Sequence, residues 1–279
     1  MDEYQKVNLA NWEERVDGHM APDGYGVDEL VNTPEALTAV VRHDAEKIGN
    51  VSGLSLLHSQ CHIGTDTLSW AKLGATVTGI DFSPKAIAAA RSIAERMGID
   101  ATFIETAVSD APQHLEDTFD IVYTSVGAIC WMPDIDEWAR VMASFVKPGG
   151  RFWIRDSHPA LMALDDGRDD DQLIVKFPYF HQHKPINFPD TESYAGSATL
   201  ENTDSYSWAH SIADVITALI NAGLVLEQFE EYQHLDWQFL SFMEKTDDDT
   251  WVLPQDVRDN VPMQFSILAS KPAPAAPTP

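Results

Sequence analysis

The segment LSLLHSQCHIGTDTLSWAKLGATVTGIDFSP, residues 54–84, decides the fold class of this chain. It holds short apolar runs at 54–58 and 76–80, which are typical of buried strands, and an amphipathic stretch at 65–73 with helical spacing. A strand, a helix and a second strand in this order predict two parallel strands joined by a right-handed crossover. The segment is therefore expected to be one unit of an α/β sheet.

The same alternation continues toward the C-terminus. Helices are expected at 84–97, 135–146 and 212–222, and strands at 101–105, 119–124, 151–155, 224–232 and 263–270. Short β-rich runs that alternate with amphipathic helices predict a doubly wound, mostly parallel sheet.

The remaining segments divide the chain around this core. We expect an N-terminal helical cap (1–50), a core (51–157), an insertion or lid (158–207), a C-terminal completion of the core (208–270) and a disordered tail (271–279). In the cap, one helix is expected around 8–16 and another from Thr33, with Pro34 in its first turn, to about Ile48. The acidic turn at 165–171 is expected to be solvated, and the aromatic-rich insertion should serve a site or an interface.

Composition narrows the function classes. The net charge of −26, with only 18 Lys and Arg in 279 residues, argues against nucleic acid as a partner. No apolar run is long enough for a membrane span, and no secretory signal is visible. Cys61 and Cys130 cannot form a disulfide framework and fit a reducing cytoplasm. We expect a cytoplasmic protein that acts on a small molecule and whose oligomeric state is open, a homodimer included.

The topology indicates where a ligand binds. In an open parallel sheet the site lies beyond the carboxyl ends of the strands. The first strand ends in the loop 58–64, whose backbone N–H groups precede a helix and can hold a polar ligand group. The second strand ends in Asp81, where a carboxylate can accept hydrogen bonds from two ribose hydroxyls. This arrangement predicts an adenosine-containing cofactor.

Six motifs in order resemble those of class I S-adenosylmethionine-dependent methyltransferases, and most closely a bacterial subfamily with a degenerate Gln-Cys/Ser-His-x-Gly first loop. The motifs are QCHIGTDTL (60–68), GIDFSP (79–84), FDIVY (119–123), GAICWMPD (127–134), KPGG (147–150) and SHP (157–159). The resemblance implies a Rossmann-like sheet of seven strands with the last strand antiparallel. It also implies S-adenosylmethionine as cofactor and direct in-line transfer of its methyl group to a small molecule, with the acceptor atom open.

The resemblance further implies a set of cofactor-binding residues: His58, Gln60, Cys61, His62, Gly64, Asp66, Thr67, Asp81, Phe82, Ala107, Val108, Ser109, Ser125 and Val126. Asp81 would bind the ribose hydroxyls and Phe82 would lie against the adenine, whose edge would meet the backbone after the third strand. The sequence departs from the family pattern where His58 and Ala107 replace acids and where Gln60 and His62 replace glycines. Simpler interpretations also exist, with Asp81 as a helix-terminal acid and Cys61 as a packed residue.

The acceptor side is less defined. His158 follows the fifth strand and is a candidate general base, or else a hydrogen-bonded structural histidine. Trp12, Tyr25, Trp131 and Tyr179 are expected to wall the substrate pocket or to pack a lid. No metal is expected, since the histidines at 181, 183, 210 and 234 lack accompanying ligands at metal-site spacing.

Two other functions remain open at this stage. A degenerate methyltransferase-like domain could bind a ligand or partner as a scaffold without catalysis, which the altered first loop would allow. An NAD-dependent oxidoreductase has a similar fold, but the first turn lacks the Gly-x-Gly-x-x-Gly fingerprint.

Overall fold

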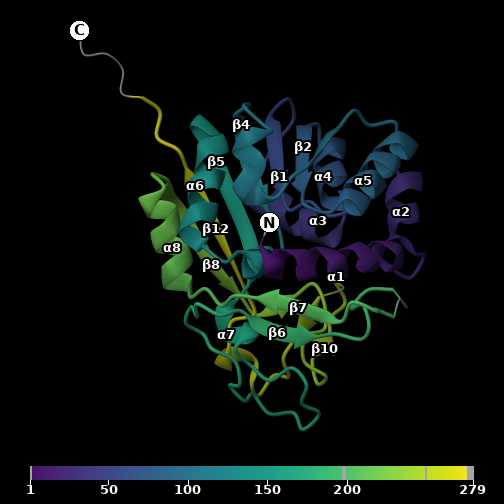
Figure 1. Cartoon of the computed structure of the whole chain (residues 1–279), viewed down its shortest axis with the longest axis vertical. Coiled ribbons are helices and arrows are strands. Elements are labelled where there is room, and N and C mark those ends of the chain that lie inside the picture. Colours follow the sequence, from purple (N-terminus) through teal and green to yellow (C-terminus); the bar gives the residue numbers. More distant parts are fainter. Residues whose placement is uncertain (1, 197–198, 249, 275–279) are drawn as a thin grey trace.

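A sheet of seven strands forms the centre of the computed structural model, which describes residues 2–196, 199–248 and 250–274 (Figure 1). The strands are β1 (Ser55–Ser59), β2 (Thr76–Asp81), β3 (Thr102–Glu105), β4 (Phe119–Thr124), β5 (Val146–Ser157), β8 (Val225–Tyr232) and β12 (Gln264–Ser270). Their order is β3-β2-β1-β4-β5-β12-β8, and only β12 runs antiparallel to its neighbours in the sheet. The Rossmann-like sheet with an antiparallel last strand is thus confirmed.

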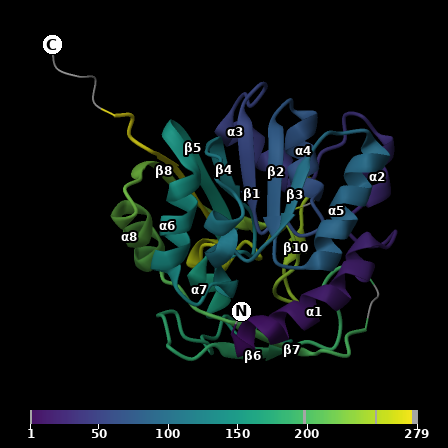
Figure 2. The ribbon, with the colours of Figure 1, turned by 45° about the horizontal axis from the view of Figure 1, so that its top comes forward.

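Alternate residues of the central strands pack against helices on opposite faces. Leu57 and Val122 belong to the cluster that includes α6 (Ile135–Phe145) and α8 (Ile212–Asn221). Leu56 and Ile121 belong to the cluster on the other face, with α3 (Ala39–Ile48) and α4 (Thr65–Lys72). The helix α5 (Pro84–Met97) packs beside α4 (Figure 2). Both faces of the parallel strands are therefore covered, as their apolar runs require.

The N-terminal cap differs from the prediction of one helix from Thr33 to Ile48. A short helix, α2 (Val27–Asn32), ends before Pro34, and α3 begins only after Thr38, whose hydroxyl accepts the Val41 N–H at 3.3 Å. The chain between them is held open by Lys72, whose ammonium donates to the carbonyls of residues 30, 33 and 36. The three carbonyls bind the Lys72 ammonium, and the periodicity of apolar residues gives no sign of such a contact.

The first helix, α1 (Glu3–Met20), lies across the carboxyl edge of the sheet (Figure 1). Beyond it are β6 (Ile186–Pro189) and β7 (Asp204–Ser207), an antiparallel pair from the insertion. The Asn8 side-chain amide donates to the Tyr206 carbonyl at 2.8 Å and accepts the Tyr206 N–H at 2.7 Å. Helix and hairpin therefore form one cover, although 198 residues separate these two partners.

A second small sheet, which the sequence analysis had included in the completion of the core, lies beside this cover. It comprises β9 (His234–Leu235), β10 (Glu244–Lys245) and β11 (Trp251–Val252). Its residues pack with α7 (Pro159–Met162) around a separate apolar cluster that includes Leu161, Leu235 and Leu253. The described residues also form three 3₁₀ turns: η1 (Val108–Gln113), η2 (Ile129–Trp131) and η3 (Arg258–Asn260).

Lys271, expected to be the first residue of a disordered tail, is paired with the sheet. Lys271 extends the β12 pairing, since its N–H donates to Gly150 and its carbonyl accepts from Gly149, at 3.0 and 2.8 Å. Residues 275–279 lie outside the described part of the chain.

Candidate active site

A cavity of about 910 Å³ opens at the carboxyl edge of the parallel strands, beneath the cover. Fifteen of the residues expected at the site line it: Trp12, Tyr25, His58, Gln60, Cys61, His62, Asp66, Asp81, Phe82, Ala107, Val108, Ser109, Ser125, Val126 and Trp131. Gly64, Thr67, His158 and Tyr179 are not part of the lining. The cavity lies where the strand order reverses between β1 and β4, as expected for a doubly wound sheet.

The loop after β1 keeps the backbone of a glycine-rich turn with only one glycine. Gln60, His62 and Gly64 have φ angles of 58°, 48° and 77°, all in the left-handed region. Each non-glycine residue there costs about 1–2 kcal/mol. Side-chain bonds hold both in place: Gln60 Nε2 donates to the Ala128 carbonyl at 2.8 Å, and His62 Nε2 lies 2.7 Å from His19 Nδ1. Glycine is required only at 64, where a Cβ would meet Ala90 at 2.8 Å.

Asp81 lies at the end of β2 and is 7% exposed. Its two carboxylate oxygens accept the backbone N–H groups of His62 and Ser83, both at 2.9 Å. Burial raises its pKa to about 6, although these hydrogen bonds oppose the shift. Each oxygen retains a lone pair, so the carboxylate can accept two further donors from the cavity. Asp81 therefore fixes the first loop and also faces the cavity.

Below the first loop, a chain of polar side chains joins α4 to the ends of β1 and β4. His58 Nδ1 lies 2.8 Å from Thr67 Oγ1, and His58 Nε2 lies 3.0 Å from Ser125 Oγ, which in turn donates to Asp66 at 3.2 Å. Burial lowers the pKa of His58 to about 3 and raises that of Asp66 to about 6. The hydrogen bond with Thr67 thus orients the His58 ring. Asp66 supplies a carboxyl near the position where the family pattern has an acid and this chain has His58.

Asp156, at the end of β5, lines the cavity and was not singled out from the sequence. Its carboxylate accepts four backbone N–H groups, from Ser157 and from 127, 128 and 129 in the loop after β4, at 2.6–3.0 Å. It therefore shapes the loop that holds Ser125 and Trp131. The sequence does contain one indication of this role, because Asp156 is an acid that directly follows the expected strand 151–155, at the ligand edge of the sheet.

The segment after β3 presents mainly backbone groups to the cavity. Ala107 precedes η1, and Val108 and Ser109 are its first residues. The first N–H groups of such a helix have no partner within it, so they remain available to a ligand. Asp110, the next carboxyl along the chain after Ala107, lies in η1 but is not part of the lining.

Aromatic side chains close the cavity from the side of α1. The Trp12 ring meets Trp131 and His62 edge to face, with centroids 5.5 and 5.2 Å apart. His19 stacks on Tyr25 with centroids 4.3 Å apart and lies between His62 and Ser193. Burial lowers the pKa of His19 to about 3, with the nearby Arg15 adding to the shift. The pair of histidines is therefore neutral, and it ties the first loop to the cover.

Two residues expected on the acceptor side lie elsewhere. His158 precedes α7: its Nδ1 accepts the Ala160 N–H at 3.1 Å, and its Nε2 lies 2.9 Å from a Glu231 carboxylate oxygen. Burial lowers the pKa of His158, and Glu231 opposes the shift. The Tyr179 hydroxyl accepts the Ile212 N–H at the start of α8. Neither side chain reaches the cavity, and their partners indicate roles in helix capping.

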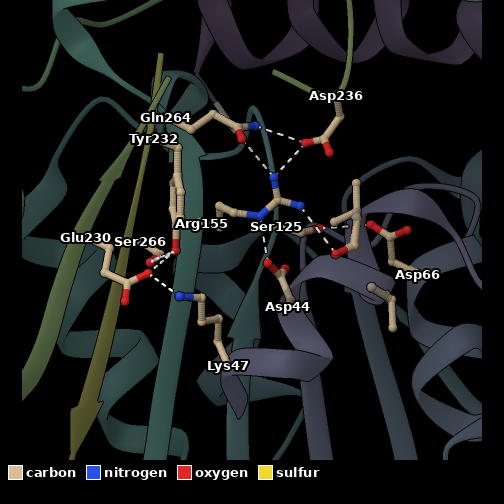
Figure 3. A network of polar contacts seen from close by, with 12 residues as sticks. Asp44, Lys47, Asp66, Ser125, Arg155, Glu230, Tyr232, Asp236, Gln264 and Ser266 are labelled. Atoms are coloured by element: carbon tan, nitrogen blue, oxygen red, sulfur yellow. Dashed lines mark hydrogen bonds and ion pairs between the residues drawn. The ribbon is translucent and has the colours of Figure 1, made fainter. Parts of the chain in front are cut away.

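The buried guanidinium of Arg155 links β5 to α3 and to Asp236, which lines the cavity (Figure 3). Arg155 of β5 donates through Nε to Asp44 of α3 and through Nη1 to Asp236, both at 2.6 Å. Gln264 accepts from the same Nη1 at 2.9 Å, and the Tyr123 hydroxyl donates to Asp44 at 2.6 Å. Burial alone would lower the pKa of Arg155, but the carboxylates of Asp44 and Asp236 have the larger combined effect. The pKa of Arg155 is therefore raised above its ordinary value. We refer to these five residues as the Arg155 clamp.

The fold and the cavity together define a Rossmann-like methyltransferase arrangement, and comparison with known proteins agrees. A family model described as a methyltransferase domain matches residues 57–152. The chain is 31% identical over 190 residues to a ubiquinone biosynthesis O-methyltransferase of Xanthomonas euvesicatoria pv. vesicatoria, covering 67% of this chain and 70% of that relative. The chain belongs to the class I S-adenosylmethionine-dependent methyltransferases.

Other relatives have different substrates or partial overlap. A ribosomal protein L11 methyltransferase of Xanthomonas axonopodis pv. citri is 32% identical over 186 residues, 58% of this chain and 56% of that relative. The chain thus spans about half the length of the relatives it first matches. A solved S-adenosylmethionine-dependent methyltransferase of Mesorhizobium loti shares the fold, with a TM-score of 0.56, 21% identity, and coverage of 82% of this chain and 97% of that one.

In the described part of the chain, no helix is long and apolar enough to cross a membrane. Within the same residues, no group of three or more His, Cys, Asp or Glu side chains is placed to hold a metal ion.

Proposed function

We propose that this chain binds S-adenosylmethionine in the cavity and transfers its methyl group to a small molecule. The observation that carries the proposal is the position of Asp81, at the end of β2, facing the cavity with lone pairs free on both carboxylate oxygens. A ribose diol supplies two hydroxyl donors at a spacing that a carboxylate accepts. The two free cysteines, Cys61 and Cys130, fit the cytoplasmic location expected from the sequence.

The remaining cofactor groups have matching neighbours in the lining. Phe82 offers a ring face to the adenine, and the N–H groups of Val108 and Ser109 offer donors to its edge. Asp66 would accept from the cofactor's ammonium group, because it lines the cavity beside Ser125, whose hydroxyl donates to it at 3.2 Å. Neutral donors such as Gln60 would hold the cofactor's carboxylate.

Methyl transfer requires the protein mainly to align the acceptor with the methyl group of the cofactor. The bound cofactor supplies an activated methyl group, and the acceptor attacks it in line with the bond to sulfur. Holding the two reactants in this geometry and excluding water accounts for several kcal/mol of rate enhancement. The cover formed by α1 and the β6–β7 pair lies over the cavity, where it would exclude water. No protein group has to form a covalent intermediate.

Calorimetry with S-adenosylhomocysteine tests the proposal. Asp81→Asn should weaken binding by about 2–3 kcal/mol, the value for hydrogen bonds to a charged group. Asp110→Asn is the matched control, since this carboxyl lies in η1 but not in the lining, and it should bind as the parent does. Preferential binding of NADH would indicate the oxidoreductase, and binding of neither ligand would indicate the scaffold.

A further inference from the structure

The part of the cavity lining that the chain contributes after β5 is rich in apolar and aromatic side chains. It includes Ile186 and Phe188 of β6, Trp208 after β7, and Trp237 and Phe239 before β10. An apolar lining with many aromatic side chains favours a ligand that contains a ring. This part holds none of the residues proposed to bind the cofactor. It is therefore where an acceptor would bind under the proposed function, on which the following argument rests.

The charge of the lining argues against an anionic acceptor. Among the residues that the structure describes, no Lys or Arg lines the cavity. Two arginines are paired with carboxylates of the lining: Arg15 lies 2.8 Å from Asp190, and Arg155 lies 2.6 Å from Asp236. A carboxylate or phosphate on the acceptor would therefore lose water without gaining a counter-charge, which is costly in a cavity.

His210 is a buried polar side chain in this part of the lining. The segment 208–210 lies along the loop after β4, because the Trp208 N–H donates to the Cys130 carbonyl at 2.8 Å and His210 Nε2 lies 2.7 Å from the Met132 carbonyl. His210 is 3% exposed and lines the cavity. Its other ring nitrogen, Nδ1, has no hydrogen-bond partner among the described residues.

The Met132 carbonyl determines which nitrogen of the His210 ring carries the proton. A carbonyl only accepts hydrogen bonds, so the proton is on Nε2 and Nδ1 of the neutral ring keeps a free lone pair. Burial lowers the pKa of His210, although the bond to Met132 opposes the shift, so the ring is neutral at neutral pH. A buried acceptor that finds no donor in the protein destabilises the fold, and a ligand that donates a hydrogen bond would remove this cost.

We propose that the methyl acceptor is an uncharged, ring-containing molecule with a hydroxyl group, and that His210 Nδ1 accepts the hydrogen bond of this hydroxyl and then its proton. A hydroxyl can donate to Nδ1 and still has lone pairs on the same oxygen for the attack on the methyl group. An ammonium group has no such lone pair, and an acid lacks a counter-charge in the lining. The ring of the acceptor would occupy the apolar part of the cavity.

The transfer step then needs no further reactant. The hydroxyl oxygen attacks the methyl carbon while the bond from that carbon to sulfur breaks, which leaves the methyl ether and S-adenosylhomocysteine. The proton of the hydroxyl passes to Nδ1 of His210. Because burial lowers the pKa of His210, the imidazolium returns this proton to water when the product leaves.

Two sets of ring-matched probes test the binding of the hydroxyl. Each set holds a phenol, its methyl ether and the corresponding acid: 4-methylphenol, 4-methylanisole and 4-methylbenzoate, and 5-hydroxyindole, 5-methoxyindole and indole-5-carboxylate. Each probe is titrated by calorimetry into the full chain saturated with S-adenosylhomocysteine. In at least one set we expect the phenol to bind about tenfold more tightly than both the ether and the acid, or tighter still, because only the phenol donates to Nδ1.

His210→Gln removes the ring nitrogen and keeps an amide N–H for the Met132 carbonyl. It should reduce the preference for the phenol over the ether to below about threefold. With S-adenosylmethionine, the parent should convert the tighter-binding phenol to its methyl ether, and His210→Gln should slow this reaction by about a hundredfold or more, the usual contribution of a general base. His43→Gln is the matched control, because His43 Nε2 also lacks a partner among the described residues but His43 lies outside the lining. It should leave preference and rate unchanged.

The assignment is overturned if the acids or the ethers bind as tightly as the phenols, or if no phenol binds at millimolar concentration. It is equally overturned if the parent forms no methyl ether, or if His210→Gln keeps the preference or the rate of the parent. Binding of S-adenosylhomocysteine in the same samples separates these outcomes from failure of the proposed function, which would show as loss of that binding.

Discussion

Asp44→Asn is a sharp test of the Arg155 clamp, because it removes one charge and almost no volume. Asp44 and Arg155 are both 0% exposed, so the guanidinium would lose a partner in a place that water does not reach. Breaking a buried ion pair from one side costs about 3–5 kcal/mol. A protein domain is stable by only about 5–15 kcal/mol, so this is a large fraction of the total.

Glu230→Gln provides the comparison. Glu230 lies 2.6 Å from Lys47, the same distance as between Asp44 and Arg155, but the two side chains are 27% and 31% exposed. Exposed pairs contribute at most about 1 kcal/mol, since water replaces the lost partner. The two substitutions therefore differ by burial and not by distance.

Urea unfolding followed by circular dichroism measures both effects, with the slope of the transition checked for constancy. We expect a loss of about 3–5 kcal/mol for Asp44→Asn and below about 1 kcal/mol for Glu230→Gln. Asp44→Asn should also weaken binding of S-adenosylhomocysteine, since Arg155 links α3 to the wall at Asp236. Equal losses in the two variants would refute the argument that burial sets the strength of the clamp.

The remaining predictions concern protonation and His158. Burial raises the pKa of Asp66 and Asp81 to about 6, so the folded chain binds these protons more tightly than the unfolded chain, and their contribution to stability falls as the pH rises from about 4 to 6. Hydrogen-bond donors of the cofactor favour the ionised forms of both carboxyls, so binding of S-adenosylhomocysteine should release protons at about pH 6 and few at about pH 8. Calorimetry in buffers of different ionisation enthalpy measures this release. Equal release at both pH values would contradict the assignment. His158→Ala should lower the unfolding free energy by about 1 kcal/mol through loss of the α7 cap, with turnover per folded molecule unchanged; a stable but inactive variant would instead support the general base.

The sequence was sufficient for the parallel part of the sheet, because those elements are short and strongly patterned. The helix at Pro84–Met97 and the strand at Phe119–Thr124 have the predicted bounds, and Ser83 caps that helix through the Ala86 N–H. Their apolar residues repeat with the period of the element that they form. Burial between two layers of helices therefore produces a pattern of apolar residues from which these elements can be predicted.

The cover of α1, β6 and β7 has no comparable pattern of apolar residues. It is held by side-chain bonds to distant backbone groups, such as Asn11 Nδ2 to the Asn202 carbonyl at 2.7 Å. The segment around β9 to β11 is built from two-residue strands, too short for any periodicity. Most residues that the family resemblance implies for the cofactor line the cavity. His158 and Tyr179 do not, since their positions depend on how the insertion folds back.

The left-handed loop has a consequence for how relatives of this chain diverge. Gln60 and His62 occupy backbone that favours glycine, and each is retained by one partner, the Ala128 carbonyl and His19 respectively. A homologue with glycine at 62 would gain a relaxed turn and would leave His19 buried with an unsatisfied ring nitrogen. Positions 19 and 62, one in a helix of the cover and the other in the loop below it, are therefore expected to be inherited and replaced as a pair.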